Sequence, residues 1–179
     1  MTKFVILEYP DPRLRKKAAP VTVVDDAVRQ LVDGMLEAMY ASNGVGLAAT
    51  QVDVQQRVLV LDVSEARNSP MVLINPQILA ASGRAITEEG CLSLPGIYDK
   101  VSRATQIRFG ALDREGRGYE MDAEGLLGVC VQHEMDHLEG VLFVDHLSEL
   151  KRQLIRRRLE KERRQRSATS DIRTSVPAL

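Results

Sequence analysis

Apolar residues recur along the chain with two different periods. Between residues 25 and 42 they return every three or four positions, which predicts an amphipathic helix with Asp25 or Asp26 at its N-cap. Two short runs of mostly aliphatic residues, at 57–63 and 71–80, are typical of strands. The first half of the chain therefore predicts a helix followed by strands.

Further strands are expected in the second half of the chain. Residues 88–96 are predicted to be a strand end that runs into a turn at Pro95-Gly96. The segments 105–113 and 118–123 flank the short sequence R-E-G, which favours a β-hairpin.

Two helices are predicted after these strands. The first covers residues 124–140, with Asp122 as N-cap and Gly140 just after the last turn. The second covers residues 148–166 and is strongly basic. Strands clustered between helices predict an α+β fold, in which mixed or antiparallel strands pack around the helix at 124–140.

Composition is that of one globular domain. The chain has 179 residues, of which 44% are hydrophobic and 27% charged, enough for a core that must be mainly aliphatic because Trp is absent. No apolar run is long enough to span a membrane, and the N-terminus lacks the layout of a secretory signal. Two cysteines do not make a disulfide framework, so we expect a cytoplasmic protein.

Charge is distributed unevenly along the chain. Residues 1–150 hold 14 Lys/Arg and 22 Asp/Glu, a net charge of −8, whereas residues 151–179 hold 10 and 3, a net charge of +7. A basic tail on an acidic body indicates an anionic partner for the tail.

The chemistry is concentrated in the sequence Q-H-E-M-D-H-L-E-G, residues 132–140. His133 and His137 are four residues apart, so on a helix they share one face and can bind the same metal ion. Glu134 lies about 100° round the helix from His133 and suits a general base acting on a bound water. A solvated helix with two histidines by chance is the plainer alternative, but the whole chain has only three His.

Two histidines need a third ligand. Some proteases place it in the pattern H-E-x-x-H-x-x-G-x-x-H, but the last position here is Phe143, which cannot bind a metal. Glu149, Glu160 and Glu162 lie in or near the basic helix, a poor place for a buried ligand. His146 fits no recognisable spacing.

The two cysteines remain. Cys130 precedes His133 on the same helix and is better explained as a small buried apolar residue. Cys91 follows Gly90 in a separate, turn-flanked segment, where no apolar periodicity requires it. A ligand from a separate segment closes a compact site, so Cys91 is the preferred third ligand.

Three segments together resemble a known family. The sequences G-V-G-L-A-A-T-Q (44–51), E-G-C-L-S-L-P-G (89–96) and Q-H-E-M-D-H-L-E-G (132–140) look like the signature segments of peptide deformylase, in the family's order. The resemblance extends over nearly all of residues 1–165, with Thr50 standing where many members carry Pro. It implies an enzyme that removes the formyl group from the N-terminal formyl-methionine of nascent bacterial polypeptides.

The resemblance implies roles for particular residues. Cys91, His133 and His137 would bind a metal, expected to be Fe(2+) with Ni, Co or Zn able to substitute, and Glu134 would carry the proton. The side chain of Gln51 and the backbone N–H of Leu92, with the backbone of Gly46 close by, would stabilise the developing oxyanion. The residues implied to hold the methionine side chain and the peptide backbone are Gly44, Val45, Gly90, Val129 and Cys130. Tyr98 stands where some members carry Arg, so the outer groove is expected to differ.

The resemblance also bears on organisation and partners. Residues 1–147 are expected to form the catalytic metallohydrolase domain of a monomer, and residues 167–179 a disordered tail. Related deformylases use a C-terminal helix to bind the ribosome near its exit tunnel, which predicts the same for residues 148–166. A solvated helix kept soluble by its charge is the alternative for this segment.

Three other functions remain open from sequence. A metalloprotease that cuts internal peptide bonds would leave Cys91 unexplained. A nucleic-acid-binding protein would require a structural metal, which is normally held by four protein ligands. An inactive homologue is disfavoured by the presence of Glu134 and Gln51.

Overall fold

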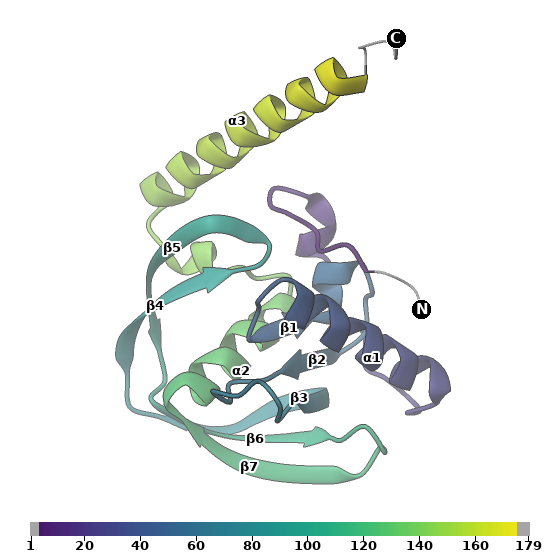
Figure 1. Ribbon diagram of the computed structural model, residues 1–179. Helices are drawn as coiled ribbons and strands as arrows, with labels where there is room; N and C mark the ends of the chain where they lie inside the picture. The colour runs from purple at the N-terminus through teal and green to yellow at the C-terminus, as the bar shows by residue number, and fades with distance from the viewer. Residues whose placement is uncertain (1–3, 175–179) are drawn as a thin grey trace.

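The computed structural model describes residues 4–174, with side chains as far as residue 165, and its described strands form two antiparallel sheets (Figure 1). The strands are β1 (Gly46–Ala48), β2 (Val58–Leu61), β3 (Met71–Ser82), β4 (Ala85–Cys91), β5 (Leu94–Arg103), β6 (Gln106–Leu112) and β7 (Gly118–Glu124). The helices are α1 (Asp26–Ala41), α2 (Gly125–Leu138) and α3 (Glu149–Thr174), with short 3-10 turns η1 (Pro12–Arg15), η2 (Ala49–Val52) and η3 (Phe143–His146). The α+β class with antiparallel strands is confirmed.

The larger sheet lies between two helices. Its strand order is β1-β2-β3-β6-β7, and α1 and α2 cover its opposite faces. Side chains alternate along β2, so Leu59 and Leu61 pack with residues of α2 while Val58 and Val60 pack with residues of α1. All four are fully buried, which explains why this strand reads as a continuous apolar run.

The smaller sheet is the β4–β5 hairpin, and here the prediction of a turn at Pro95-Gly96 was wrong. Cys91 already pairs with Leu94, so the chain reverses at Leu92-Ser93, three residues earlier than predicted. The register shifts between Gly90 and Cys91, and Gly96 has a φ of +71° within β5. Pro95 and Gly96 therefore form an irregularity within β5 and not the turn itself.

The first helix agrees with its predicted boundaries. The side chain of Asp25 accepts a hydrogen bond from the N–H of Val28 at 3.0 Å and caps α1, as the sequence predicted. Gly140 follows the C-cap of α2 with a φ of +73°, also as predicted.

The predicted N-cap of α2 was wrong. Asp122 belongs to β7, which continues to Glu124, and the helix begins directly at Gly125. Gly125 has a φ of +56°, so a sharp change of backbone direction replaces a side-chain cap.

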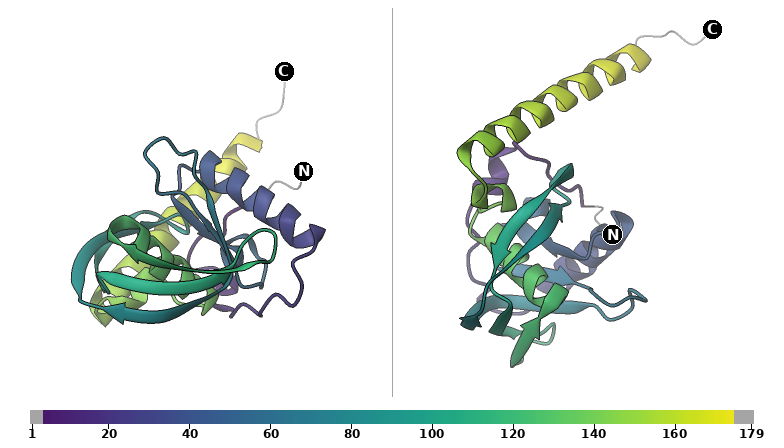
Figure 2. Two further views of the ribbon diagram at one scale, coloured as in Figure 1. Left: turned by 90° about the horizontal axis from the view of Figure 1, so that it is seen from below. Right: turned by 90° about the vertical axis from the view of Figure 1, so that its left-hand side faces the viewer.

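A third apolar cluster joins β5, η3 and the base of α3. Leu94, Val101, Phe143 and Leu159 are each 2% exposed or less within it. Beyond this base, α3 extends away from the body of the molecule (Figure 2). It continues to Thr174, past the predicted end at residue 166, and the last part of the predicted tail, residues 175–179, lies outside the described residues. Among residues 4–174, no helix is long and apolar enough to cross a membrane.

Candidate active site

A helix and a strand from different parts of the chain bring three metal-binding side chains together. His133 and His137 lie one turn apart on α2, and Cys91 ends β4. The Cys91 Sγ atom is 3.2 Å from His137 Nε2, and the donor atoms of all three residues lie within 4.8 Å of one another. A tetrahedral ion with bonds of about 2.0–2.3 Å separates its ligand atoms by about 3.5 Å, so this group fits one metal ion.

Cys130 is outside this group. It is 5% exposed, and its Sγ lies 3.7 Å from the carbonyl oxygen of Val45. Burial raises the pKa of its thiol well above the ordinary value, which keeps the sulfur protonated.

A buried ion pair orients one of the histidines. His133 Nδ1 is 2.8 Å from Glu89 Oε2, so Nε2 is the ring nitrogen that can bind a metal. Arg103 donates to both oxygens of Glu89, at 2.7 and 3.0 Å. Burial opposes ionisation of Glu89, but the hydrogen bonds from His133 and Arg103 outweigh it and lower the pKa of Glu89 to about 2. The carboxylate is therefore charged, and it favours the His133 tautomer that presents Nε2.

The network continues to the surface. Arg103 also donates to Asp136 at 2.6 Å, and His146 Nε2 is 2.7 Å from the same Asp136 oxygen. Sequence reasoning missed Glu89 and Arg103. The strand period was a signal for Glu89, because it places residue 89 on the same face as residue 91, but nothing local pointed to Arg103.

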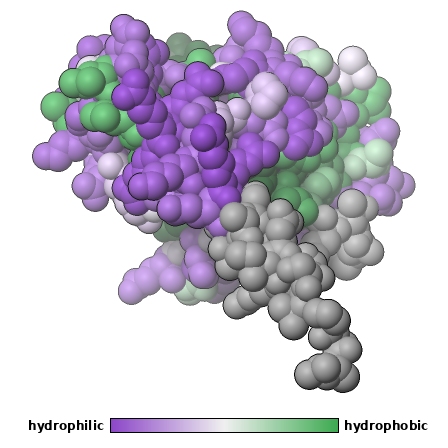
Figure 3. All heavy atoms as spheres, turned by 90° about the horizontal axis from the view of Figure 1, so that it is seen from above, coloured by the Kyte–Doolittle hydropathy of each residue, from purple (hydrophilic) through white to green (hydrophobic). Residues whose placement is uncertain are grey.

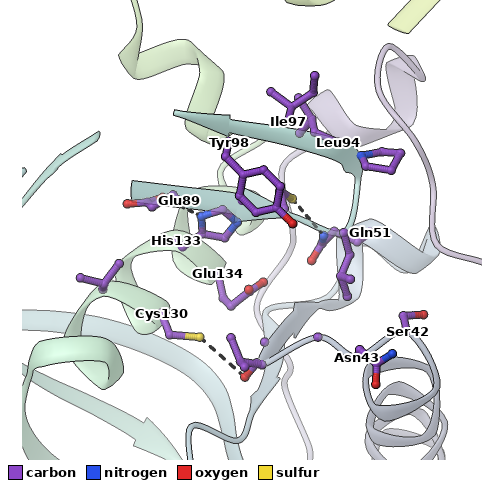
Figure 4. Close-up of a pocket in the computed structure, with 18 of the residues that line it drawn as sticks. Ser42, Asn43, Gln51, Glu89, Leu94, Ile97, Tyr98, Cys130, His133 and Glu134 are labelled. Atoms are coloured by element: carbon purple, nitrogen blue, oxygen red, sulfur yellow. Dashed lines mark hydrogen bonds and ion pairs between the residues drawn. The ribbon is translucent and has the colours of Figure 1, made fainter. Parts of the chain in front are cut away.

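The amide of Gln51 is held in one orientation. Its Oε1 accepts a hydrogen bond from the backbone N–H of Ala48 at 2.8 Å. Its Nε2 donates to Ser93 Oγ at 3.1 Å and lies 3.6 Å from Cys91 Sγ (Figure 4). The N–H end of the amide therefore faces the metal-binding group.

Glu134 lies beside that group with one oxygen unpaired. The residue is 5% exposed, and its Oε2 is buried without a hydrogen-bond partner among the described residues. Burial raises its pKa to about 7. Gly46 provides the space, because a Cβ there would lie 2.5 Å from Glu134 Oε1 and 2.8 Å from Cys130 Sγ.

A pocket of about 470 Å³ opens above these residues, as the close-up shows (Figure 4). His137 is not among the residues that line it and is 1% exposed. Leu126, which the sequence did not single out, also lines it and is 58% exposed. The predicted site residues that line the pocket are Gly44, Val45, Gly46, Gln51, Gly90, Cys91, Leu92, Val129, Cys130, His133 and Glu134.

These features define a class of enzyme. A helix with H-E-x-x-H, a cysteine from a separate strand and a buried carboxylate beside them is an arrangement typical of metal-dependent hydrolases. The chain belongs to the polypeptide deformylase family, whose family model matches residues 4–153. This match confirms the resemblance found in the sequence. Peptide deformylases are hydrolases that remove N-formyl groups.

Named relatives agree with this assignment. The peptide deformylase of Alkalilimnicola ehrlichii is 64% identical over 161 residues, which cover 89% of this chain and 90% of that protein. The crystal structure of a peptide deformylase from Legionella pneumophila superposes with a TM-score of 0.88 at 46% identity, covering 93% of this chain and 98% of that one. The peptide deformylase from Ehrlichia chaffeensis in complex with actinonin gives a TM-score of 0.87 at 39% identity, covering 90% and 98%.

Proposed function

We propose that this protein hydrolyses the N-formyl group of the N-terminal formyl-methionine of nascent polypeptides and releases formate. The observation that carries the proposal is the position of Glu134, whose Oε2 is buried and unpaired among the described residues. It lies beside a group of three possible metal donors, of which Cys91 and His133 line the same pocket as Glu134. A buried carboxylate with a pKa near 7 suits an exchange of protons with water at neutral pH.

Cys91, His133 and His137 are proposed to hold one Fe(2+) ion, with Ni, Co or Zn able to replace it. The donor set supports a borderline ion, since it combines a sulfur with two imidazole nitrogens. Burial lowers the pKa of His137 well below its ordinary value, which keeps this imidazole neutral, as a ligand must be. When bound, the ion supplies Lewis acidity that activates water and polarises the formyl oxygen.

Glu134, Gln51 and nearby backbone groups are proposed to carry the remaining steps of the reaction. Glu134 accepts a proton from the attacking water and later donates it to the leaving amine of methionine. The attacked formyl carbon becomes tetrahedral and its oxygen gains negative charge. The Nε2 group of Gln51 and the backbone N–H of Leu92 stabilise this charge, with the backbone of Gly46 near it. The hydrogen bond from the backbone N–H of Ala48 to Gln51 Oε1 supports this role, because it keeps the Nε2 group of Gln51 directed toward Cys91.

Two parts of the substrate are proposed to be recognised separately, the methionine side chain and the peptide backbone. Val45, Val129 and Cys130 line the pocket and are proposed to receive the methionine side chain. The peptide backbone is proposed to bind between Gly90 and residues 44–46. Residues 44–46 are here called the wall segment. β1 is an edge strand, which supports the addition of an extended peptide. Bonds to the backbone ignore side-chain identity, so many nascent chains would be accepted.

The decisive experiment is the release of formate from formyl-Met-Ala-Ser by anaerobically prepared protein with measured metal content. Acetyl-Met-Ala-Ser should be inert, and an internal peptide bond should stay intact. Formate release above the metal-free control supports the proposal, whereas cleavage of internal bonds would favour a metalloprotease.

The C-terminal helix is proposed to dock a monomeric, cytoplasmic enzyme on the ribosome near the exit tunnel, with residues 1–147 as the catalytic part. Every described Lys and Arg side chain of α3 is exposed. Arg157, Lys161 and Arg164 follow one another at helical spacing and so form one basic face, here called the cationic face. The face of the molecule seen from above is mostly hydrophilic (Figure 3). An RNA-rich partner is supported because phosphates release counterions on binding such a face.

A further inference from the structure

A compact loop after β2 bonds to two residues that line the pocket, Gly44 and Val45. This loop, residues 62–69, begins at Asp62, which is 1% exposed. The Asp62 carboxylate accepts hydrogen bonds from the N–H and hydroxyl of Ser64, at 2.9 and 2.6 Å, and from the N–H of Ser69 at 3.1 Å. The hydroxyl of Tyr40 donates to the same carboxylate at 2.6 Å. These bonds close the loop on itself and tie it to the end of α1.

Two successive backbone carbonyl groups of the wall segment, those of Gly44 and Val45, accept hydrogen bonds from this loop. The N–H of Asp62 donates to the carbonyl of Val45 at 2.8 Å. The guanidinium of Arg67 donates to the carbonyl of Gly44 at 2.7 Å and lies over the ring of Tyr40, 5.4 Å from its centroid. Arg67 has a φ of +52°, a conformation that costs free energy in a residue other than glycine and that the surrounding contacts hold in place.

The wall segment is also confined on its other side. A Cβ on Gly44 would lie 2.5 Å from Leu92 Cδ1, and one on Gly46 would lie 2.5 Å from Glu134 Oε1. The segment therefore lies between the loop and two groups of the active site. Its position sets the space that remains for a peptide in the pocket.

We propose that Arg67 is a positioning residue for the formyl-peptide, because it fixes the Gly44 carbonyl and so the wall segment. This inference rests on the proposed function, in which the wall segment binds the peptide backbone. Two of the three wall residues are glycines, whose backbones lose the most freedom when they are ordered. Arg67 orders the two glycines before the substrate arrives. Without Arg67, the substrate would have to order them on binding, and this entropy cost would weaken binding.

The test compares full-length, metal-loaded Arg67→Ala, Arg67→Lys and wild-type protein, with metal content measured for each. With formyl-Met-Ala-Ser, Arg67→Ala should raise KM by about tenfold, the size expected for loss of a charged hydrogen bond, and leave kcat within about twofold. Arg67→Lys should lie between the two, because an ammonium group can donate to Gly44 but lacks the planar group that lies over Tyr40. Inhibition by formate, which has no peptide backbone, should stay unchanged in both variants.

Arg108→Ala is the matched control, since Arg108 is an exposed arginine paired with Glu120 on the β6–β7 hairpin. Its KM and kcat should equal those of wild type. An unchanged KM in Arg67→Ala would overturn the inference, and so would a joint loss of metal and kcat, which would indicate a merely structural role. Failure of wild-type protein to release formate would instead overturn the proposed function.

Discussion

Glu134 combines deep burial with a carboxylate oxygen that is unpaired among the described residues. Glu134→Gln keeps the size of the side chain and removes the proton acceptor without removing a proposed ligand. We therefore expect metal content to stay at the wild-type level while kcat falls by about 10²–10⁴-fold, the range for a general acid–base group. Stopped assays of formate release with parallel metal analysis would measure both. Near wild-type turnover in the metal-loaded variant would show that another group carries the proton.

The two cysteines give a paired test of the ligand assignment. Cys91 contributes its sulfur to the group of donor atoms, whereas Cys130 is a buried thiol with a raised pKa. Cys91→Ser should therefore lower metal content and abolish formate release, because a hydroxyl is a weaker ligand than a thiolate for such an ion. Cys130→Ser should retain the metal. If Cys130→Ser empties the site and Cys91→Ser leaves it filled, the assignment is reversed.

The grouping of Cys91, His133 and His137 could be predicted because their geometry is local or their segment distinctive. His133 and His137 meet through the helical period alone, and Cys91 lies in a segment with its own signature. The Glu89–Arg103 pair could not be predicted in this way. Its partners are separated by 14 residues and meet only through the β4–β5 hairpin, whose turn was misplaced from sequence.

At the scale of the element, local signals predicted α1 and the β6–β7 hairpin, whereas tertiary context decided the rest. Asp25 caps α1 because its side chain reaches the first turn of its own helix. Asp122 failed as a cap because pairing with Arg108 keeps it in β7. The turn at Pro95-Gly96 failed because the pairing of Cys91 with Leu94 had already closed the hairpin. Strand pairing thus overrode two signals that are reliable in isolation.

The helix α3 has a packed side and an exposed cationic face, and this difference determines how docking can be tested. Leu159 is 2% exposed in the third apolar cluster together with Leu94 of β5. Truncation after Leu150 would remove this packing and disturb the strand that lines the pocket. Neutralising the cationic face leaves the packing intact.

We expect the triple variant Arg157→Gln, Lys161→Gln, Arg164→Gln to bind ribosomes more weakly and to hydrolyse formyl-Met-Ala-Ser at the wild-type rate. Each lost phosphate contact should reduce the slope of log affinity against log salt by about 0.7–0.9, so three contacts should reduce it by about 2–3. Sedimentation with ribosomes at several salt concentrations would give this slope. The matched control replaces three exposed arginines of the body, Arg84, Arg108 and Arg117, by Gln. Equal losses in both variants would show that net charge, and not the cationic face, governs binding.

At the scale of the whole molecule, three apolar clusters surround a site whose polar groups are mostly buried. Aliphatic burial on both faces of β2 stabilises the centre, and the loop closed by Asp62 joins α1, β2 and the pocket wall. A buried carboxylate in that position makes the stability of the fold depend on pH, because its hydrogen-bond donors stabilise the charged form more than the protonated form.

Asp62 provides the test of this dependence. Burial opposes its ionisation, but hydrogen bonds from Ser64, Tyr40 and Ser69 outweigh the burial and lower the pKa from 3.8 to about 2. A pKa that is lower in the folded state adds stability above the unfolded pKa, and this contribution disappears as the pH falls through the folded value. The shift corresponds to about 2 kcal/mol at neutral pH. Asp62→Asn should therefore lower the free energy of unfolding by about that amount at pH 7, and the difference from wild type should shrink between about pH 4 and pH 2. Urea unfolding followed by circular dichroism at each pH would measure it, with the exposed Asp122→Asn as the matched control. A difference that stays constant as the pH falls would mean that Asp62 acts through packing and not through its charge.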